Sequence, residues 1–162
     1  MRDQNASFPE FTYWRSLDAL YHTQDAAARL QTIKRVRLCR RASVVDLSPE
    51  LFQPLLKLAV DFDNYGGETR CQFVPGVAVL LGGGDEPEYV LICCFKCHDI
   101  HVVRRPSADH PKRLTGLATM SPELESTIFE LTRASYPNDE ELQSFQLEKR
   151  VRAKRPYEKH AD

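Results

Sequence analysis

The residues of this chain best suited to chemistry are the cysteines near position 95. Four of the five cysteines lie between Cys71 and Cys97, and His98 follows the last of them. Cys94 and Cys97 have the C-x-x-C spacing that lets two thiolates bind one tetrahedral zinc ion, and Cys71 and His98 can complete a set of four ligands. The sequence therefore offers one candidate metal site, a structural zinc centre made of these four residues.

The same cysteines also suit a purely structural role. A structural zinc site usually combines two paired motifs, and a second C-x-x-C pair is missing here. Cys93 and Cys94 are neighbours in an apolar run, so in a strand they point to opposite faces. Because a thiol behaves as a small apolar group, we expect these side chains to fill space in a sheet, with no bound cofactor.

A thiol-dependent redox enzyme with Cys94 or Cys97 as nucleophile is a further interpretation. A thiol at the start of a helix is acidified and can exchange disulfides, but this pair follows one β-like run and precedes another. The number of cysteines is odd and the first residues contain no apolar export signal, so we expect reduced thiols and a cytoplasmic location. No stretch of about 18 apolar residues occurs, so we expect no membrane partner.

Hydrophobic patterning around the cysteines predicts a β-rich centre. Residues 71–81 and 88–95 are apolar runs separated by a glycine-rich turn at 82–87, and together they predict a hairpin. Residues 99–104 form a third run directly after the cysteines. Upstream, residues 33–41 alternate apolar and basic side chains, which predicts a half-buried strand with a basic outer face.

Four segments predict helices. Residues 48–51 and 121–124 share the sequence S-P-E-L, which places a hydroxyl at the N-cap, proline at the first helical position and an acid near the positive helix end. Residues 16–30 repeat apolar side chains at helical spacing. A fourth helix is predicted to begin at the acidic residues 138–141 and to end in the basic residues 149–155.

Together these elements predict the fold class α+β, a single domain with a mainly antiparallel sheet and flanking helices. We divide the chain into an N-terminal arm (residues 1–15), an α+β core domain (16–137) and a C-terminal basic helix with a frayed tail (138–162). A chain of 162 residues buries about 70% of its unfolded surface, which is enough for one core.

The charges of the chain nearly cancel. Its 22 basic and 23 acidic residues give a net charge of −1, so no overall field attracts nucleic acid or an anionic membrane. We interpret the basic residues 34–41 as the solvent-exposed face of a strand and the basic residues 149–155 as the C-terminal end of a helix. We therefore expect no nucleic-acid partner. The acidic residues expected to face a basic protein partner are Asp61, Asp63, Glu68, Asp85, Glu86 and Glu88.

The cysteine and proline pattern resembles that of a group of small bacterial proteins of unknown function. Their mark is a cysteine and a proline ahead of a β-hairpin that ends in I-C-F-x-C, and the similarity extends over about residues 30–135. These proteins often carry a histidine two residues after the proline, where this chain has Val77, which removes one potential metal ligand. The positions that match the mark are Cys71, Pro75, Cys94, Phe95 and Cys97.

The resemblance implies no enzymatic activity. On this resemblance, the chain is similar to the small accessory proteins that bacteria encode beside secreted toxins, lipoproteins or polymorphic systems. Charged faces of mixed sign and a size that suits one standard interface agree with a binding role. We therefore predict a non-enzymatic bacterial protein-binding protein of the immunity or antitoxin type, which inhibits a toxin by covering its active site. A structural zinc-binding module and a thiol-dependent redox enzyme are the alternatives.

Overall fold

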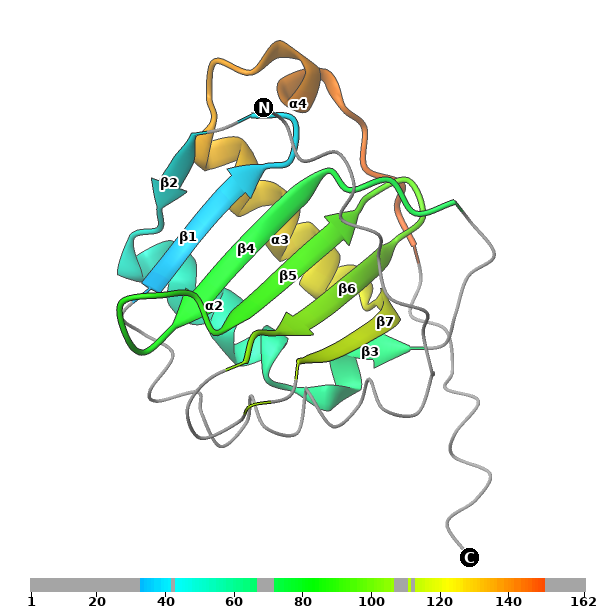
Figure 1. Cartoon of the computed structure of the whole chain (residues 1–162). Helices are drawn as coiled ribbons and strands as arrows, with labels where there is room; N and C mark the ends of the chain where they lie inside the picture. The colour runs from blue at the N-terminus through cyan, green and yellow to red at the C-terminus, as the bar shows by residue number, and fades with distance from the viewer. Residues whose placement is uncertain (1–32, 42, 67–71, 107–110, 112, 151–162) are drawn as a thin grey trace, which may run out of the picture.

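The computed structural model describes residues 33–41, 43–66, 72–106, 111 and 113–150 (Figure 1). These residues form one seven-stranded sheet with helices packed against it, which confirms the predicted α+β class and single-domain arrangement. Along the chain the elements are β1 (Ile33–Leu38), β2 (Val44–Asp46), α2 (Pro49–Ala59), the 3-10 helix η2 (Phe62–Asn64), β3 (Tyr65–Gly66), β4 (Val77–Gly82), β5 (Tyr89–Cys94), β6 (Asp99–Arg104), β7 (Leu114–Met120), α3 (Pro122–Ser135) and α4 (Glu140–Ser144).

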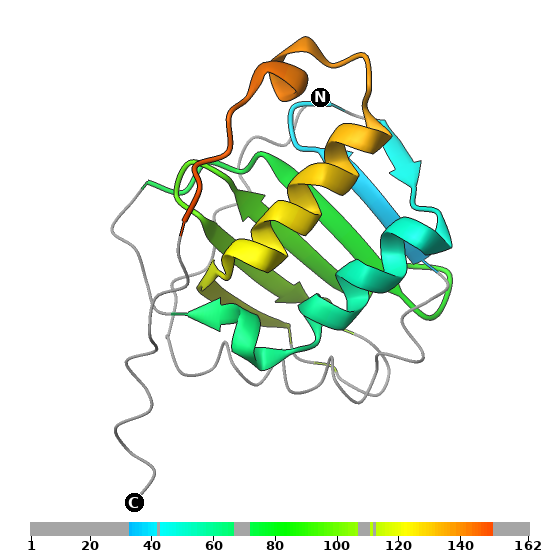
Figure 2. The ribbon, with the colours of Figure 1, turned by 180° about the vertical axis from the view of Figure 1, so that it is seen from behind.

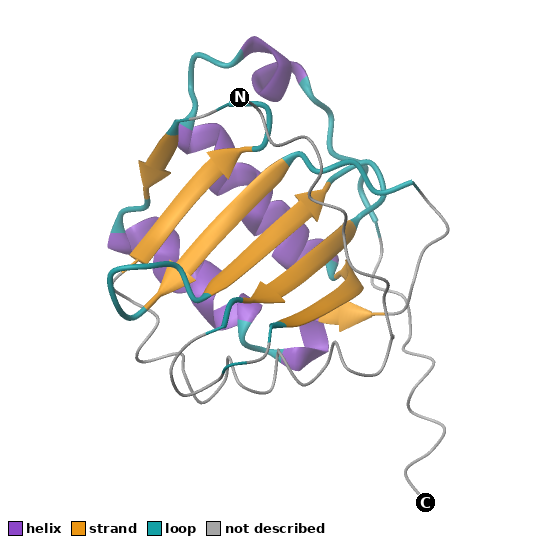
Figure 3. Cartoon of the chain, viewed as in Figure 1, coloured by secondary structure: helices purple, strands orange, loops and turns teal. Residues whose placement is uncertain are grey.

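Every pair of neighbouring strands is antiparallel, in the order β2-β1-β4-β5-β6-β7-β3. β1 and β2 form a first hairpin, and α2 then carries the chain to the far edge, where β3 pairs with the end of β7. β4 to β7 form a meander through the centre of the sheet. Figure 2 shows α2 and α3 together on one face, and the same layering appears by secondary structure in Figure 3. The fold is therefore a two-layer arrangement of sheet and helices.

Strict alternation along the strands explains which residues face the helices. Val36, Val79, Leu91 and Val102 lie opposite one another across β1, β4, β5 and β6, and all four are buried. Their neighbours in sequence point to the other face because side chains alternate in a strand. One row of side chains thus belongs to the closed core.

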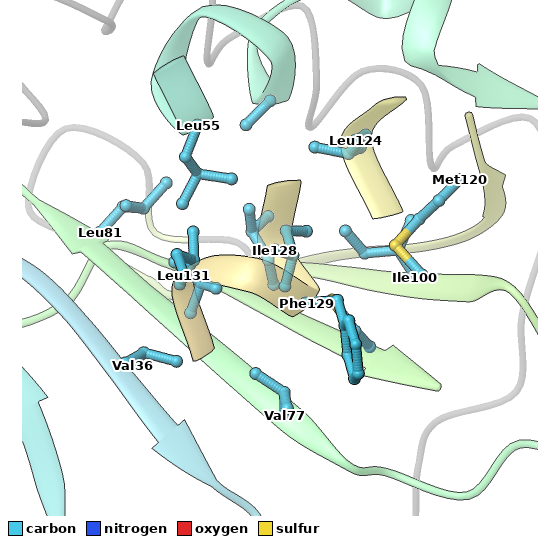
Figure 4. Packing of buried hydrophobic residues seen from close by; sticks show 14 of the residues in the cluster. Val36, Leu55, Val77, Leu81, Ile100, Met120, Leu124, Ile128, Phe129 and Leu131 are labelled. Atoms are coloured by element: carbon cyan, nitrogen blue, oxygen red, sulfur yellow. The ribbon is translucent and has the colours of Figure 1, made fainter. Parts of the chain in front are cut away.

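The helices complete this core with one face each. Leu55 of α2 and Leu124 and Ile128 of α3 are fully buried, and Figure 4 shows them between the helices and the sheet. Burying a leucine or isoleucine side chain contributes about 1.5–3 kcal/mol. The core is therefore the main source of stability of the described residues.

The predicted starts of α2 and α3 are confirmed. Ser121 caps α3, where its hydroxyl accepts a hydrogen bond from the Leu124 N–H at 3.1 Å and donates one to Asn64 Oδ1 at 2.7 Å. Ser48 has the extended conformation of an N-cap but makes no capping side-chain bond. Pro54 lies inside α2, and the helix continues past it to Ala59.

Several elements differ from the sequence-based expectation. β4 begins at Val77 instead of residue 71, and the short strands β2 and β3, as well as β7, were not predicted. β7 has the sequence LTGLATM, in which glycine and alanine give a weak strand signal. The predicted C-terminal basic helix is wrong for residues 145–150, because α4 ends at Ser144 and Phe145 is extended. The predicted arm and the helix at 16–30 lie outside the described residues, as do residues 151–162.

None of the helices in the described part of the chain is both long and apolar enough to span a bilayer.

Candidate functional site

An open apolar pocket of about 310 Å³ lies where the central strands meet the helix layer. Its lining includes Leu38 at the end of β1, residues 74–77 leading into β4, and Cys94 at the end of β5. Phe129 of α3 and Leu142 of α4 line it from the helix side. Pockets for small ligands usually hold roughly 300–1,000 Å³. The pocket therefore fits one large side chain or a small molecule.

Three phenylalanines from distant parts of the chain form one wall of the pocket. The ring centroids of Phe95 and Phe129 are 5.2 Å apart, and those of Phe129 and Phe145 are 5.7 Å apart. Tilted or T-shaped ring pairs contribute about 0.5–1.5 kcal/mol beyond their burial. The Arg133 guanidinium lies 5.5 Å from the Phe129 centroid and adds a cation–π contact. These contacts fix the shape of the wall.

Charged residues of both signs border the pocket. Arg40 bonds Asp139 with both terminal nitrogens, and its Nε donates to Glu141 Oε2 at 2.9 Å. Arg41 Nη2 lies 2.7 Å from Asp139 Oδ2. The hydrogen bond from the Leu142 N–H, more than the two arginines, holds the pKa of the Asp139 carboxyl below its ordinary value. Asp139 therefore stays ionised and fixes α4 to the β1–β2 hairpin.

Lys96 lies at the border of the pocket and carries a positive charge. Its side chain is exposed, and no carboxylate among the residues that the structure describes forms an ion pair with it. Arg40, in contrast, is neutralised by Asp139 and Glu141. The pocket thus combines an apolar interior with a cation that is available to an incoming group.

His98 ends the β5–β6 turn in a left-handed backbone conformation. Its φ of 62° is the one positive value for a non-glycine residue in the described ranges, and such a conformation costs roughly 1–2 kcal/mol. The imidazole ring offsets this cost, since Nδ1 lies 2.8 Å from Glu125 Oε1 and Nε2 lies 3.1 Å from Glu148 Oε2. The Met120 N–H also donates to the His98 carbonyl at 2.8 Å. The turn beside the pocket is therefore held by specific bonds.

Glu125 is the centre of a buried polar network below this turn. Its side chain is 1% exposed, and Arg150 Nε donates to Glu125 Oε2 at 3.1 Å. Arg150 Nη2 also donates to the Met120 carbonyl at 3.0 Å. A buried carboxylate is costly unless it is paired, and His98 and Arg150 supply the pairing. The network holds the C-terminal segment against the start of α3, which places Phe145 in the pocket wall.

The two adjacent cysteines of β5 point to opposite faces of the sheet, as predicted. Cys93 lies in the core opposite Val77 and Ile100, and burial raises the pKa of its thiol well above the ordinary value. Its thiol therefore stays protonated, which does not suit a nucleophile. Cys94 pairs in register with Asp99 and lines the pocket, although it is only 1% exposed.

The predicted zinc ligands have different surroundings. Cys97 is disulfide-bonded, so it is not a thiolate here, and the expectation of reduced thiols is wrong for this residue. Its Sγ lies 3.2 Å from the Gln72 carbonyl oxygen. His98 directs both ring nitrogens at carboxylates. Cys71 lies outside the described residues, and within those residues no three Cys, His, Asp or Glu side chains gather as a metal site. The zinc and redox-enzyme hypotheses stay predictions.

The acidic residues predicted to face a partner lie in two separate places. Asp61 and Asp63 lie beside β3, where the Asp63 N–H donates to Asp61 Oδ1 at 2.9 Å. β3 pairs with the last residues of β7, whereas the β4–β5 turn lies level with its first residues. Glu68 lies outside the described residues, and the described acids do not form one surface. The acids in or next to the β4–β5 turn are Asp85, Glu86 and Glu88.

Sequence reasoning missed the pocket. Leu142 and Phe145 follow the predicted helix start at a spacing of three, which was a usable signal for one apolar side. The contact between Arg40 and Asp139 joins residues 99 positions apart, and no local pattern indicates it. The pocket is therefore a product of the tertiary fold.

Comparisons with known proteins give no relative for this chain. No protein-family model matches the sequence, no curated protein matches it, and no solved structure matches the fold. The resemblance to small bacterial proteins with an I-C-F-x-C hairpin accordingly stays a prediction.

Proposed function

We propose that this protein is a non-enzymatic binding protein that receives an apolar side chain of a protein partner in the pocket between β5, α3 and α4. The observation that carries the proposal is the pocket itself, an apolar space of about 310 Å³ that is open to solvent. Protein partners commonly anchor one large side chain in such a space, and this anchor supplies much of the binding energy.

The border of the pocket supports a protein partner over a free small molecule. Protein interfaces have an apolar centre surrounded by a polar rim. Here Arg40 and Glu141 form a paired rim, and Lys96 adds a cation that no carboxylate of the described residues neutralises. Val74 lines the pocket with 53% of its surface exposed, which extends the apolar area outward. An apolar anchor with an adjacent carboxylate complements this arrangement.

We propose further that the partner is a toxin, so that the protein acts as an immunity or antitoxin-like inhibitor. The support for this class comes from the resemblance to small accessory proteins that bacteria encode beside toxins. In such a complex the pocket anchors the partner, and the surrounding charged surface covers its active site.

Photocrosslinking in the native host tests the proposal. p-Benzoylphenylalanine is placed at position 74, which lines the pocket, and at position 44 on the edge strand β2, which does not. The two sites are matched because both valines are exposed, by 53% and 46%. Position 74 should capture one defined protein that position 44 does not capture, and Lys96→Glu should lower the yield.

No capture at position 74, or the same proteins at both positions, would overturn the binding role of the pocket. Mass spectrometry of the captured protein tests the toxin separately. A captured partner with no toxic activity would support the binding role of the pocket and would overturn the immunity role.

A further inference from the structure

The pocket between β5, α3 and α4 is larger than an aliphatic side chain needs. Its volume of about 310 Å³ lies at the lower limit for sites that enclose a small molecule. A valine or leucine anchor would leave much of this space empty, and the lining atoms would lose the contacts that a filled pocket provides. Tryptophan is the largest side chain and buries up to about 250 Å² of surface. The volume therefore favours an indole ring as the anchor.

The wall of the pocket suits a flat aromatic ring. Phe95, Phe129 and Phe145 already pack with one another in tilted and T-shaped pairs, at interplanar angles of 47°, 57° and 78°. An aromatic ring that enters the pocket can extend this cluster, because such pairs place the positive edge of one ring on the negative face of another. An aliphatic side chain gains no contact of this kind, so the wall favours the same anchor as the volume.

The mouth of the pocket suits the polar part of an indole. Glu141 lines the pocket, and its side chain is 80% exposed. Arg40 Nε uses one of the roughly four lone-pair positions of this carboxylate, so the carboxylate can accept a further hydrogen bond. The indole N–H is a donor. Lys96 is a cation on the same border, and the face of tryptophan attracts a cation more strongly than the other aromatic rings do.

We propose that the anchor received by this pocket is a tryptophan side chain of the protein partner, with its ring against the three phenylalanines and its N–H donated to the carboxylate of Glu141. The inference rests on the proposed function, because it names the residue that the binding pocket takes from a partner. Leucine and phenylalanine have no donor for Glu141. Tyrosine has a donor on a smaller ring system, so it should rank below tryptophan.

Capped amino acids titrated into the full chain test the proposal, with the amide signals of Val77, Lys96 and Leu142 followed by NMR. N-acetyl-tryptophanamide should shift these signals and should bind about tenfold more tightly than N-acetyl-leucinamide. The affinities of the phenylalanine and tyrosine derivatives should fall between these two. The 1-methyltryptophan derivative, which lacks the N–H, should bind about fivefold more weakly than the tryptophan derivative.

Variants at the mouth locate the bound N–H. Glu141→Ala removes the acceptor, so it should bind the tryptophan and 1-methyltryptophan derivatives equally. Glu141→Gln keeps an acceptor oxygen and should restore the preference for tryptophan. Both substitutions change an exposed side chain, so the fold should be unaffected. Val74→Asp should abolish the shifts at the pocket amides, while the exposed control Val44→Asp should keep them.

The possible failures are distinct from a failure of the proposed function. A leucine derivative that binds the pocket as tightly as the tryptophan derivative would leave the binding role intact and overturn the indole anchor. A preference for the N–H that survives Glu141→Ala would overturn the bond to Glu141. Unshifted pocket amides with every derivative would overturn the inference as a whole, whereas the proposed function depends on the capture of a protein at position 74.

Discussion

Helix α3 contributes to two apolar regions that are built in different ways. Ile128 is fully buried in the core between the sheet and α2. Phe129, one position later, packs its ring against Phe95 and Phe145 in the wall of the pocket. The pocket is formed by strand ends, a tight turn, a short helix and an extended segment.

The difference shows how stability and binding are divided in this fold. The core depends on the alternation of side chains in regular strands. The pocket depends on polar bonds that hold irregular segments in place, above all those of Glu125 and Asp139. Irregular segments on a rigid scaffold commonly carry binding residues. We therefore expect substitutions in the two regions to separate unfolding from binding.

Truncation in the core should have the largest effect on stability. Leu91 lies in the middle of β5, is 1% exposed and faces the helices. Leu91→Ala should lower the free energy of unfolding by about 2–5 kcal/mol because it leaves a cavity. Val74→Ala in the pocket should change it by less than about 0.5 kcal/mol. Urea denaturation checks both values, and equal losses would show that the pocket lining is part of the core.

Acid should destabilise the protein through His101 of β6, whose side chain is buried. Burial, with the charge of Arg113 as a second cause, lowers the pKa of His101 from 6.5 to about 4. The folded state then binds fewer protons than the unfolded state between these two values. Stability present above about pH 6.5 is therefore lost as the pH falls toward about 4, by at most on the order of 3 kcal/mol.

Urea midpoints at a series of pH values between about 4 and 7 check this dependence. His101→Gln should flatten it, because glutamine does not titrate. A variant that keeps the wild-type slope would assign the pH dependence to another group and would contradict the role of His101.

Neutralising the buried carboxylate below the turn should have an intermediate effect. Glu125→Gln removes the charge that pairs with His98 and Arg150, and should cost about 2 kcal/mol because both partners are partly exposed. The exposed Glu148 is the control, since Glu148→Gln should cost less than about 0.5 kcal/mol. Thermal or urea unfolding measures both. Equal losses of stability in the two variants would contradict the central role of Glu125 in the network.

The smallest effect on stability is expected at the rim of the pocket. Asp139→Asn can still cap α4 but loses its charge opposite Arg40 and Arg41, which should cost about 1 kcal/mol. Because its pKa is lowered in the folded state, this contribution is present above about pH 4 and is lost as the pH falls further. Glu141→Gln is the exposed control. If Asp139→Asn were as stable as the wild type at neutral pH, the stabilising role of the ion pairs between Asp139 and the two arginines would be contradicted.

The sequence was sufficient for the elements that depend on local patterns. The β4–β5 hairpin, β6 and the starts of α2 and α3 were predicted because alternation and the S-P-E-L capping sequence act over a few residues. β2 and β3 have three and two residues, too few for a period to show. The opposite orientation of Cys93 and Cys94 also followed from alternation alone.

The candidate site was beyond local patterns. Cys94 and Lys96 are two positions apart in the sequence, whereas Phe145, which lines the same pocket, lies far along the chain from both. α4 ends at Ser144, where Phe145 is extended and packs its ring in the aromatic wall instead of continuing the helix. Contacts between distant segments place these side chains, and the local spacing indicates only that Leu142 and Phe145 share an apolar side.

The most direct test is the affinity of the crosslinked partner for two matched variants, measured by isothermal titration calorimetry. Val74→Asp places a charge in the apolar pocket and should weaken binding at least tenfold, while Val44→Asp on the edge strand should stay within about twofold of the wild type. Unfolding midpoints should match for all three proteins. Undiminished binding by Val74→Asp, or an equal loss in Val44→Asp, would contradict the assignment of binding to the pocket.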